Sequence, residues 1–408
     1  MISITETQKK ILFIIFFVTF TIGTGYALYY FFFKPLPSPT LDTEETPPAY
    51  TGALTLSGER TAEQPFIPSQ PTGLPVADQV SSQITETATT DVLRSKVTQS
   101  LSLSKNGLPR YYDPLDGRFY QLTPDGKEQK LSNRQFLNVE TINWSNISNQ
   151  VILEFPDGSN IYYNFDEDRQ VTLPSHWEDF AFSPIEDKIV AKSIGLDERN
   201  RFLVVSDANG NEATALYELG SNADRVIPSW SPNNRVVGFS KTGDPLPDDG
   251  EEILLLGKNH ESYRPLKVAG KGFLPSWSPT GKQLLYSIYH ARDNYKPMLW
   301  ISDASGAEIG RNRRQLNINT WADKCVWDDE QTIYCGVPIA LPDGAGWDRN
   351  LVSSVSDNIY RIDLKTGTAK KINQTPLTRP INNPQLNSEQ NQIIYTDTIT
   401  GHLYKFDL

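Results

Sequence analysis

The sequence predicts an all-β protein, a β-propeller of seven blades, preceded by a transmembrane helix and a disordered linker. Three observations predict this fold: a repeat with a period of 40–50 residues, short alternating strands within each repeat, and an uncharged apolar run near the N-terminus. A length of 408 residues would allow about two to four ordinary domains. The repeat favours one large domain instead, because a blade buries both of its faces only against its neighbours.

The apolar run covers residues 11–33 and contains no charged side chain. About 20 apolar residues span a bilayer, so we expect a single-pass transmembrane helix that contacts the lipid bilayer through 11–33. Lys9 and Lys10 precede the run and Lys34 follows it, which places residues 1–10 in the cytoplasm by the positive-inside rule. A cleaved signal peptide, which has a shorter apolar core, and a buried helix of a soluble protein stay as alternatives. With an anchor or a signal, the rest of the chain lies outside the cytoplasm.

Residues 34–100 form the predicted flexible linker, in which Pro, Thr, Ser and Glu dominate and no apolar period persists. Such a segment cannot bury enough apolar surface to offset the entropy lost on ordering it. Its end is ambiguous, because residues 84–103 fit a short helix or a first strand. Residues near 88–104 are also candidates for a strand that closes the ring.

The repeat itself occupies residues 101–408. Its clearest copies are IPSWSPNNRVVGFS at 227–240 and LPSWSPTGKQLLYS at 274–287, which start 47 residues apart. Each has a strand ending in Trp-Ser-Pro, a polar turn and a second apolar strand. A third alternating strand follows, for example MLWISDASGAE at 298–308. Four short strands per repeat are typical of a propeller blade.

The number of blades follows from the length of the repeat region. Its 308 residues give 44 per blade for seven blades. Residues 108–132 match the second, third and fourth strands of a unit, and the last unit, 384–408, stops after its third strand. Six blades, with the first and last units merged, is the alternative.

The strings WSPTGKQLLYS at 277–287 and LWISDASGAE at 299–308 resemble the WD40-like repeats of the TolB-type propeller family. That family pattern is a strand, Ser-Pro-Asp-Gly-Lys, a second strand, and an apolar strand ending in Asp-x-x-Gly. This chain has Asn233-Asn234 and Thr280-Gly281 where Asp-Gly is usual, and a predicted anchor in place of the small domain of the TolB protein. The resemblance implies a propeller that binds partners, without implying an activity.

One face of the propeller is expected to carry a rim. The loops between second and third strands are long in four consecutive units: 193–201, 241–252, 288–297 and 336–357. Insertions in repeat proteins collect on one face, often the binding face. The rim contains an acidic lip and, beside it, the mixture of Tyr, Trp and Arg that anchors interfaces. The lip comprises Asp244, Asp248, Asp249, Glu251 and Glu252, and the anchors with their neighbour are Arg292, Tyr295, Trp347, Asp348 and Arg349. Merely solvated loops, or calcium capture by the lip, are the alternatives.

The rest of the composition limits the chemistry. A net charge of -11 argues against nucleic-acid binding, which needs a basic face. Four dispersed histidines and the absence of hydrolase, metalloprotease or P-loop motifs indicate no catalytic, metal or cofactor site. Cys325 and Cys335 flank one turn between strands. With residues 328–331 as that turn, Cys325 faces Tyr334, so a disulfide needs a slight register adjustment and two separate thiols are equally compatible.

Together, the sequence predicts a membrane-anchored, extracytoplasmic propeller that acts as a non-enzymatic interaction module in a prokaryotic cell envelope. Its expected partner is an envelope protein or peptide. The alternative is an envelope hydrolase of glycans or peptides, with paired carboxylates at the propeller pore.

Overall fold

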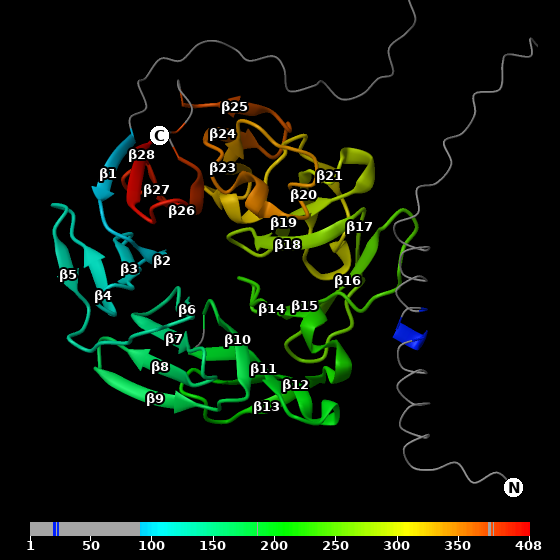
Figure 1. Cartoon of the computed structure of the whole chain (residues 1–408), viewed down its shortest axis with the longest axis horizontal. Coiled ribbons are helices and arrows are strands. Elements are labelled where there is room, and N and C mark those ends of the chain that lie inside the picture. Colours follow the sequence, from blue (N-terminus) through cyan, green and yellow to red (C-terminus); the bar gives the residue numbers. More distant parts are fainter. Residues whose placement is uncertain (1–18, 22, 24–89, 186, 374–376, 378) are drawn as a thin grey trace, which may run out of the picture. The chain divides into compact units, whose positions relative to one another are not determined.

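The computed structural model describes residues 19–21, 23, 90–185, 187–373, 377 and 379–408. Residues 90–408 contain seven four-stranded antiparallel sheets arranged in a ring (Figure 1). This confirms the predicted all-β, seven-bladed propeller and excludes the six-bladed alternative.

Each of the first six blades uses four consecutive strands, the first innermost and the fourth outermost. Blade 1 consists of β2 (Gln99–Leu103), β3 (Pro109–Asp113), β4 (Arg118–Leu122) and β5 (Glu128–Lys130). Blade 2 consists of β6 (Thr141–Trp144), β7 (Gln150–Glu154), β8 (Asn160–Asn164) and β9 (Arg169–Leu173). Blade 3 consists of β10 (Trp177–Phe182), β11 (Lys188–Ile194), β12 (Arg201–Asp207) and β13 (Thr214–Glu218). Blade 4 consists of β14 (Val226–Pro228), β15 (Val236–Ser240), β16 (Glu251–Gly257) and β17 (Leu266–Val268). Blade 5 consists of β18 (Lys271–Trp277), β19 (Gln283–Tyr289), β20 (Pro297–Asp303) and β21 (Arg314–Gln315). Blade 6 consists of β22 (Cys325–Trp327), β23 (Thr332–Pro338), β24 (Asp357–Asp363) and β25 (Ala369–Lys371). Short 3-10 helices lie in the connections: η1 (Glu198–Asn200), η2 (Gly220–Arg225), η3 (Ala291–Asp293), η4 (Gly306–Glu308), η5 (Ala322–Lys324) and η6 (Arg349–Val352).

The seventh blade joins two distant parts of the chain. Its sheet has the order β1-β28-β27-β26, formed by β26 (Ile381–Asn387), β27 (Gln392–Asp397), β28 (Leu403–Asp407) and, outermost, β1 (Thr90–Arg94). The expectation that residues near 88–104 supply the missing strand is confirmed. The propeller therefore begins at least eleven residues earlier than the expected start at residue 101, because β1 completes the sheet that the last unit leaves one strand short.

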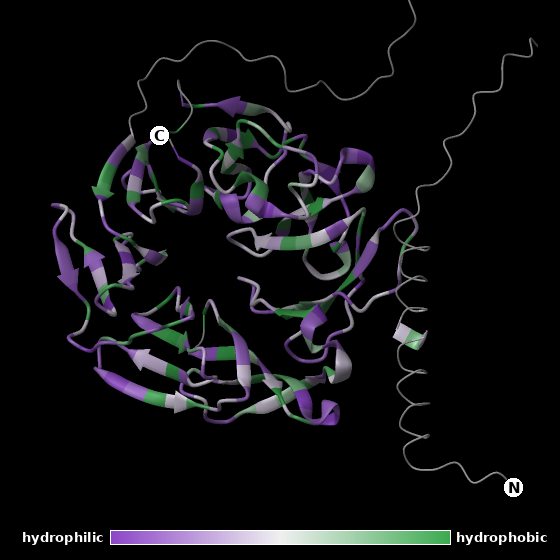
Figure 2. Cartoon of the chain, in the orientation of Figure 1, coloured by the Kyte–Doolittle hydropathy of each residue, from purple (hydrophilic) through white to green (hydrophobic). Residues whose placement is uncertain are grey.

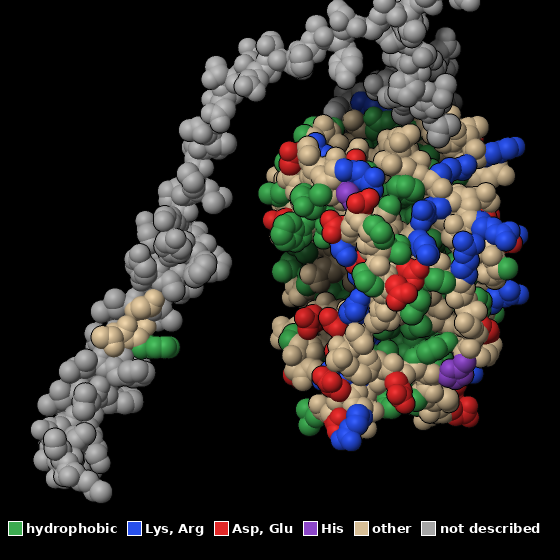
Figure 3. All heavy atoms as spheres, turned by 90° about the vertical axis from the view of Figure 1, so that its right-hand side faces the viewer, with side chains coloured by type: hydrophobic (Ala, Val, Ile, Leu, Met, Phe, Trp, Pro, Cys, Tyr) green, Lys and Arg blue, Asp and Glu red, His purple; other side chains and the backbone are tan. Residues whose placement is uncertain are grey.

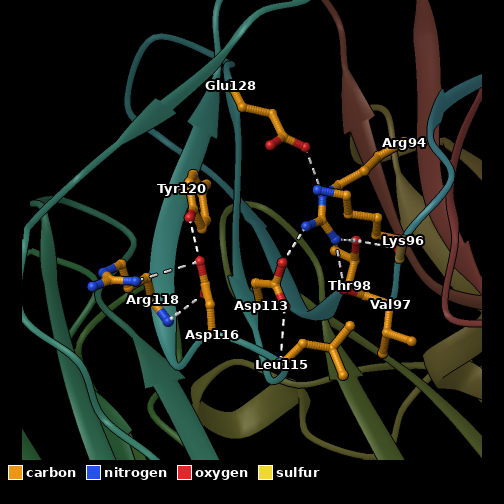
Figure 4. A network of polar contacts seen from close by, with 10 residues as sticks. All are labelled: Arg94, Lys96, Val97, Thr98, Asp113, Leu115, Asp116, Arg118, Tyr120 and Glu128. Atoms are coloured by element: carbon orange, nitrogen blue, oxygen red, sulfur yellow. Dashed lines mark hydrogen bonds and ion pairs between the residues drawn. The ribbon is translucent and has the colours of Figure 1, made fainter.

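Arg94, the last residue of β1, fastens this closure to blade 1 (Figure 4). Its guanidinium binds the buried carboxylate of Asp113, at the end of β3, and lies 2.7 Å from the Glu128 carboxylate on β5. It also donates to the carbonyl of Val97 at 2.6 Å. One buried cation thus connects the first and last blades.

The core lies between blades rather than in one centre. For example, Ile152 and Tyr162 of blade 2 pack with Trp177 and Ile189 of blade 3. Hydrophobic residues are concentrated in the middle strands, whereas outer strands such as β5 and β25 are hydrophilic (Figure 2). This distribution explains the alternating apolar strands and polar turns of the repeat.

The tryptophan of the Trp-Ser-Pro repeat connects neighbouring blades. The indole N–H of Trp277 donates to Ser229 Oγ at 3.0 Å, and that of Trp327 donates to Ser276 Oγ at 3.2 Å. The degenerate copy does the same, because Trp144 donates to the carbonyl of Ser100 at 2.8 Å. In blades 2, 5 and 6 this tryptophan therefore holds the innermost strand to the blade before it, whereas Trp230 of blade 4 donates to Asn234 Oδ1 at 2.7 Å within its own hairpin.

The predicted anchor and most of the linker lie outside the described residues. Of 11–33 the structure describes only 19–21 and 23, which are helical. In the described part of the chain, no helix has the length and apolar character needed to cross a membrane. The predicted transmembrane helix therefore has no support from the structure.

Candidate functional site

The face of the propeller that carries the connections between second and third strands is called the loop face here. The four long loops of the predicted rim lie on it, as β11–β12, β15–β16, β19–β20 and β23–β24. These connections share one face because every blade is antiparallel and all innermost strands occupy equivalent positions.

Hydrogen bonds join the loops of blades 4 to 7 into one continuous structure, which we call the ridge (241–250, 290–296, 339–356 and 398–402). His290 Nε2 donates to the carbonyl of Asp248 at 2.6 Å, and its Nδ1 accepts from the Arg292 N–H at 2.9 Å. Gly346 N–H donates to the carbonyl of Tyr295 at 2.7 Å. Thr398 Oγ1 donates to the carbonyl of Ser353 at 3.2 Å. The bonds described for the blade 3 loop, such as Gly195 N–H to Asn200 O, stay within that blade.

The acidic lip divides into two parts. Asp248 and Asp249 form the exposed tip of a tight turn, with φ of 54° and 58° and a bond from Gly250 N–H to Pro247 O at 3.1 Å. Short polar residues such as Asp tolerate the left-handed backbone conformation, and positive φ at both central residues defines a type I′ turn. Glu251 and Glu252 instead lie on β16, 3.3 Å from Lys271 and 3.0 Å from Lys267. The lip is therefore smaller than expected and consists of the two turn residues and the exposed Asp244.

Two aromatic side chains are the most prominent part of the ridge. The Trp347 side chain is 75% exposed and the Tyr295 side chain 40%, and their ring centroids lie 6.3 Å apart. They come from neighbouring blades, so the hydrogen bond between their loops is what brings them together. Large exposed aromatic rings held by a rigid backbone are typical anchors of protein interfaces.

The remaining predicted rim residues have mainly structural contacts. Arg349 lies 2.5 Å from the Asp323 carboxylate and stacks 4.8 Å above the Trp321 ring. Asp348 accepts from the Asn350 N–H at 3.0 Å, which caps η6. Arg292 is exposed, and its Nε donates to His290 Nδ1 at 3.2 Å. These side chains hold the loops that present the aromatic pair.

Exposed large hydrophobic residues are concentrated on the loop face. In the described propeller, seven of eleven such residues lie in connections between second and third strands. The seven are Leu115, Leu196, Tyr295, Ile339, Trp347, Leu351 and Ile399. Scattered exposed apolar residues would be divided among all surfaces, so the loop face is more apolar than the other described surfaces of the propeller.

A polar recess that the sequence did not predict lies beside the innermost strands of blades 2 to 4. Two hollows of about 430 and 300 Å³ share Thr141, Glu154 and Asp179. The carboxylate of Glu154 accepts from Asn143 Nδ2 at 2.9 Å and from the Asp179 N–H at 3.0 Å. Burial raises the pKa of Glu154, and the charges of Asp179 and Glu178 raise it further.

Lys192 also lines the recess. Its buried ammonium lies 2.5 Å from Asp179 and 3.3 Å from Glu178, and donates to the carbonyl of Ala223 at 3.2 Å. The hydrolase alternative needs two carboxylates, and Glu154 and Asp179 are the two that both hollows share. Both oxygens of Glu154 accept hydrogen bonds and Asp179 pairs with Lys192, so the contacts form a structural network. The residues come from different blades, and no motif in the sequence marks them.

Cys325 and Cys335 are joined by a disulfide between β22 and β23. The expected register, with Cys325 opposite Tyr334, is wrong: Cys325 pairs with Cys335 and Val326 with Tyr334. The turn is one residue longer than expected because Asp329 Oδ1 accepts from the N–H groups of Gln331 and Thr332, each at 2.7 Å. Among the residues that the structure describes, no group of three or more His, Cys, Asp or Glu side chains is arranged to hold a metal ion.

The fold and its loop face place the chain in the class of seven-bladed β-propellers. No protein-family model and no curated protein matches it. Among solved structures it is similar to streptogramin B lyase, with a TM-score of 0.52 and 9% identity, over 80% of this chain and 100% of that chain. It is also similar to the tricorn protease, with a TM-score of 0.50 and 10% identity, over 79% of this chain and 34% of that chain. This chain thus spans about a third of the length of the tricorn protease chain. Identities this low show a shared fold alone.

Proposed function

We propose that this chain is a non-enzymatic interaction module and that the ridge is its binding surface. The observation that carries the proposal is the exposed pair Tyr295 and Trp347 on loops that hydrogen bonds hold together. A rigid surface loses little conformational entropy when a partner binds, so its exposed apolar area contributes efficiently to affinity.

The placement that fits this role is outside the cytoplasm of a prokaryotic cell envelope, on an anchor formed by residues 11–33. The uncharged apolar run supports the anchor, and the Trp-Ser-Pro units with their Asp-x-x-Gly turns support membership of the TolB-type family. The disulfide between Cys325 and Cys335 supports an oxidising compartment, because cytoplasmic thiols are kept reduced. The proposed partner is an envelope protein or peptide.

Crosslinking on intact cells with a membrane-impermeant, amine-reactive reagent tests the proposal. Lys296 lies on the ridge beside Tyr295 and offers the amine. We expect a protein crosslinked to the wild-type chain to be lost from the double variant Tyr295→Ala/Trp347→Ala, because truncating two aromatic anchors removes most of the interface energy.

Ile147→Ala is the matched control, since Ile147 is exposed in the β6–β7 turn, away from the loop face. It should retain the crosslinked protein. A partner retained by the double variant would exclude the ridge as the binding surface. A crosslink that forms only after the cells are permeabilised would exclude the extracytoplasmic placement and leave the ridge unaffected.

A further inference from the structure

A second surface lies between the outer edges of blades 4 and 5 and meets the ridge at one end, where the two share Leu246, Asp248 and Arg292. Two hollows of about 290 and 270 Å³ lie there and share Lys267, on β17, and Arg313, just before β21. We call this surface the outer groove. Arg264 lies in one hollow and Arg292 in the other, so four cationic side chains line its length.

The charge of the outer groove is only partly neutralised by the protein. Lys267 lies 3.0 Å from the Glu252 carboxylate. The guanidinium of Arg313 donates to the neutral carbonyl of Lys267 and lies 6.0 Å from the centre of the Trp300 ring. Arg292 contacts His290, and among the described residues Arg264 has no carboxylate partner. Among the described residues, the guanidinium groups of Arg264, Arg292 and Arg313 therefore form no ion pair with a carboxylate.

This local positive charge is opposite in sign to the net charge of -11 of the whole chain. Lys and Arg side chains gather along one flank of the side of the propeller shown in Figure 3. A cluster of unpaired arginines in an acidic protein attracts anionic groups and favours bidentate contacts with carboxylates.

The lining also has an apolar part, which narrows the class of ligand. In one hollow the lining includes Leu246, Pro247 and Asp248 of the ridge and, from the blade 4 edge, Val268 and Ala269. A uniform polyanion would gain nothing from the apolar side chains and would be repelled by Asp248. A peptide with an apolar residue followed by acidic residues matches both parts.

We propose that the outer groove binds an extended acidic peptide segment of a partner protein. The acidic residues of the peptide contact Arg264, Lys267 and Arg313, and its apolar residue packs on Leu246 and Val268. Asp248 orients the peptide, because its charge disfavours a carboxylate at the end that the groove shares with the ridge. The proposal depends neither on the anchor nor on the aromatic pair Tyr295 and Trp347.

Fluorescence anisotropy with the full chain tests this proposal. The probe is a fluorescein-labelled peptide of sequence Leu-Gly-Asp-Glu-Asp-Glu, and its isostere Leu-Gly-Asn-Gln-Asn-Gln is the comparison. We expect the acidic peptide to bind and the isostere not to bind. We also expect affinity to fall between about 0.05 and 0.5 M salt, because added ions screen exposed charges.

Charge reversal identifies the site. Arg264→Glu and Arg313→Glu should each weaken binding by at least about tenfold, as expected for the loss of a charge-assisted hydrogen bond. Arg314→Glu is the matched control, because Arg314 is exposed and adjacent to Arg313 but does not line the groove. Arg264 has no described hydrogen bond, so Arg264→Glu stays informative if Arg313→Glu fails to fold.

Several results would overturn the proposal. They are equal weakening by Arg314→Glu, equal binding of the isostere, and an unchanged affinity in Arg264→Glu. Binding of inorganic phosphate or of phosphatidylglycerol vesicles that requires Arg264 and Arg313, without binding of the peptide, would assign the groove to a different anion.

Discussion

The half-buried carboxylate of Glu154 shows how one residue can make folding depend on pH. Burial and the nearby acids raise its pKa, so the folded protein binds a proton at Glu154 more tightly than the unfolded chain does. The free energy of unfolding must therefore fall as the pH rises from the pKa of Glu154 in the unfolded chain through its higher pKa in the folded protein. Asn143 and the Asp179 N–H limit this penalty by donating to the carboxylate.

We predict that Glu154→Gln removes this dependence. The difference in free energy of unfolding, variant minus wild type, should be more positive at about pH 7 than at about pH 4. Glutamine carries no charge to desolvate, so only wild type loses stability as this carboxyl ionises. Urea unfolding at both pH values measures the difference. Glu140→Gln, an exposed acid lining the same recess, is the control and should show a smaller change. A larger change in the control would contradict the prediction.

Individual residues also show where sequence reasoning reaches its limit. The spacing of the repeated tryptophans indicated the length of the repeat unit. The indole contacts of Trp277 and Trp327 with the preceding blade explain why a tryptophan recurs at that position. Glu251 and Glu252 were grouped with the loop acids because only Gly250 separates them from Asp249 in the sequence. Their pairing with Lys271 and Lys267 depends on strand register and on the next blade, which one sequence does not specify.

At the scale of elements, the β22–β23 hairpin combines a turn and a covalent link. Asp329 lengthens the turn by one residue and thereby brings Cys325 opposite Cys335. The disulfide restricts the unfolded chain over a sequence separation of 10 residues. Loop-closure entropy for such a short loop is worth roughly 2–3 kcal/mol.

We predict that Cys325→Ala/Cys335→Ala lowers the free energy of unfolding by roughly 2–3 kcal/mol. Chemical denaturation of wild type and variant measures the loss. Wild type unfolded in a reducing agent is the control and should lose a similar amount. Two titratable thiols in the unreduced, denatured protein would show that the bridge does not form.

Strands and loop lengths were predictable because periodicity and turn residues are local signals. The long loops of blades 3 to 6 indicated a rim, and those of blades 4 to 6, together with the β27–β28 loop, form the ridge. Sequence did not indicate the recess or the outer groove. Their lining residues come from separate blades, so the packing of neighbouring blades is what brings Glu154 to Asp179, or Arg264 to Arg313.

At the scale of the whole molecule, stability depends on closing the ring between blade 7 and blade 1. Arg94, at the end of β1, holds blade 7 to blade 1, because its buried guanidinium contacts Asp113 and Glu128 of blade 1. Removing one partner of a buried ion pair leaves the other charge desolvated and unpaired.

We predict that Arg94→Met lowers the free energy of unfolding by about 3–5 kcal/mol. Denaturant unfolding of the full chain measures the loss, and adding Asp113→Asn should recover part of it by removing the unpaired charge. Lys127→Met is the control, because Lys127 forms an exposed pair with Asp125 and its loss should change the stability little. Equal losses in Arg94→Met and Lys127→Met would contradict a closing role for β1.

The pairing of β1 with β28 also orders events during protein synthesis. Of the strands in the propeller, β1 leaves the ribosome first, yet its partner is among the last to be made. Until then Leu101 and Tyr111 of blade 1 lack the contacts with Ile394 and Leu403 that bury them. A nascent chain stalled before β26 would therefore carry an unfilled apolar face and an unpaired strand, the features that chaperones and proteases recognise.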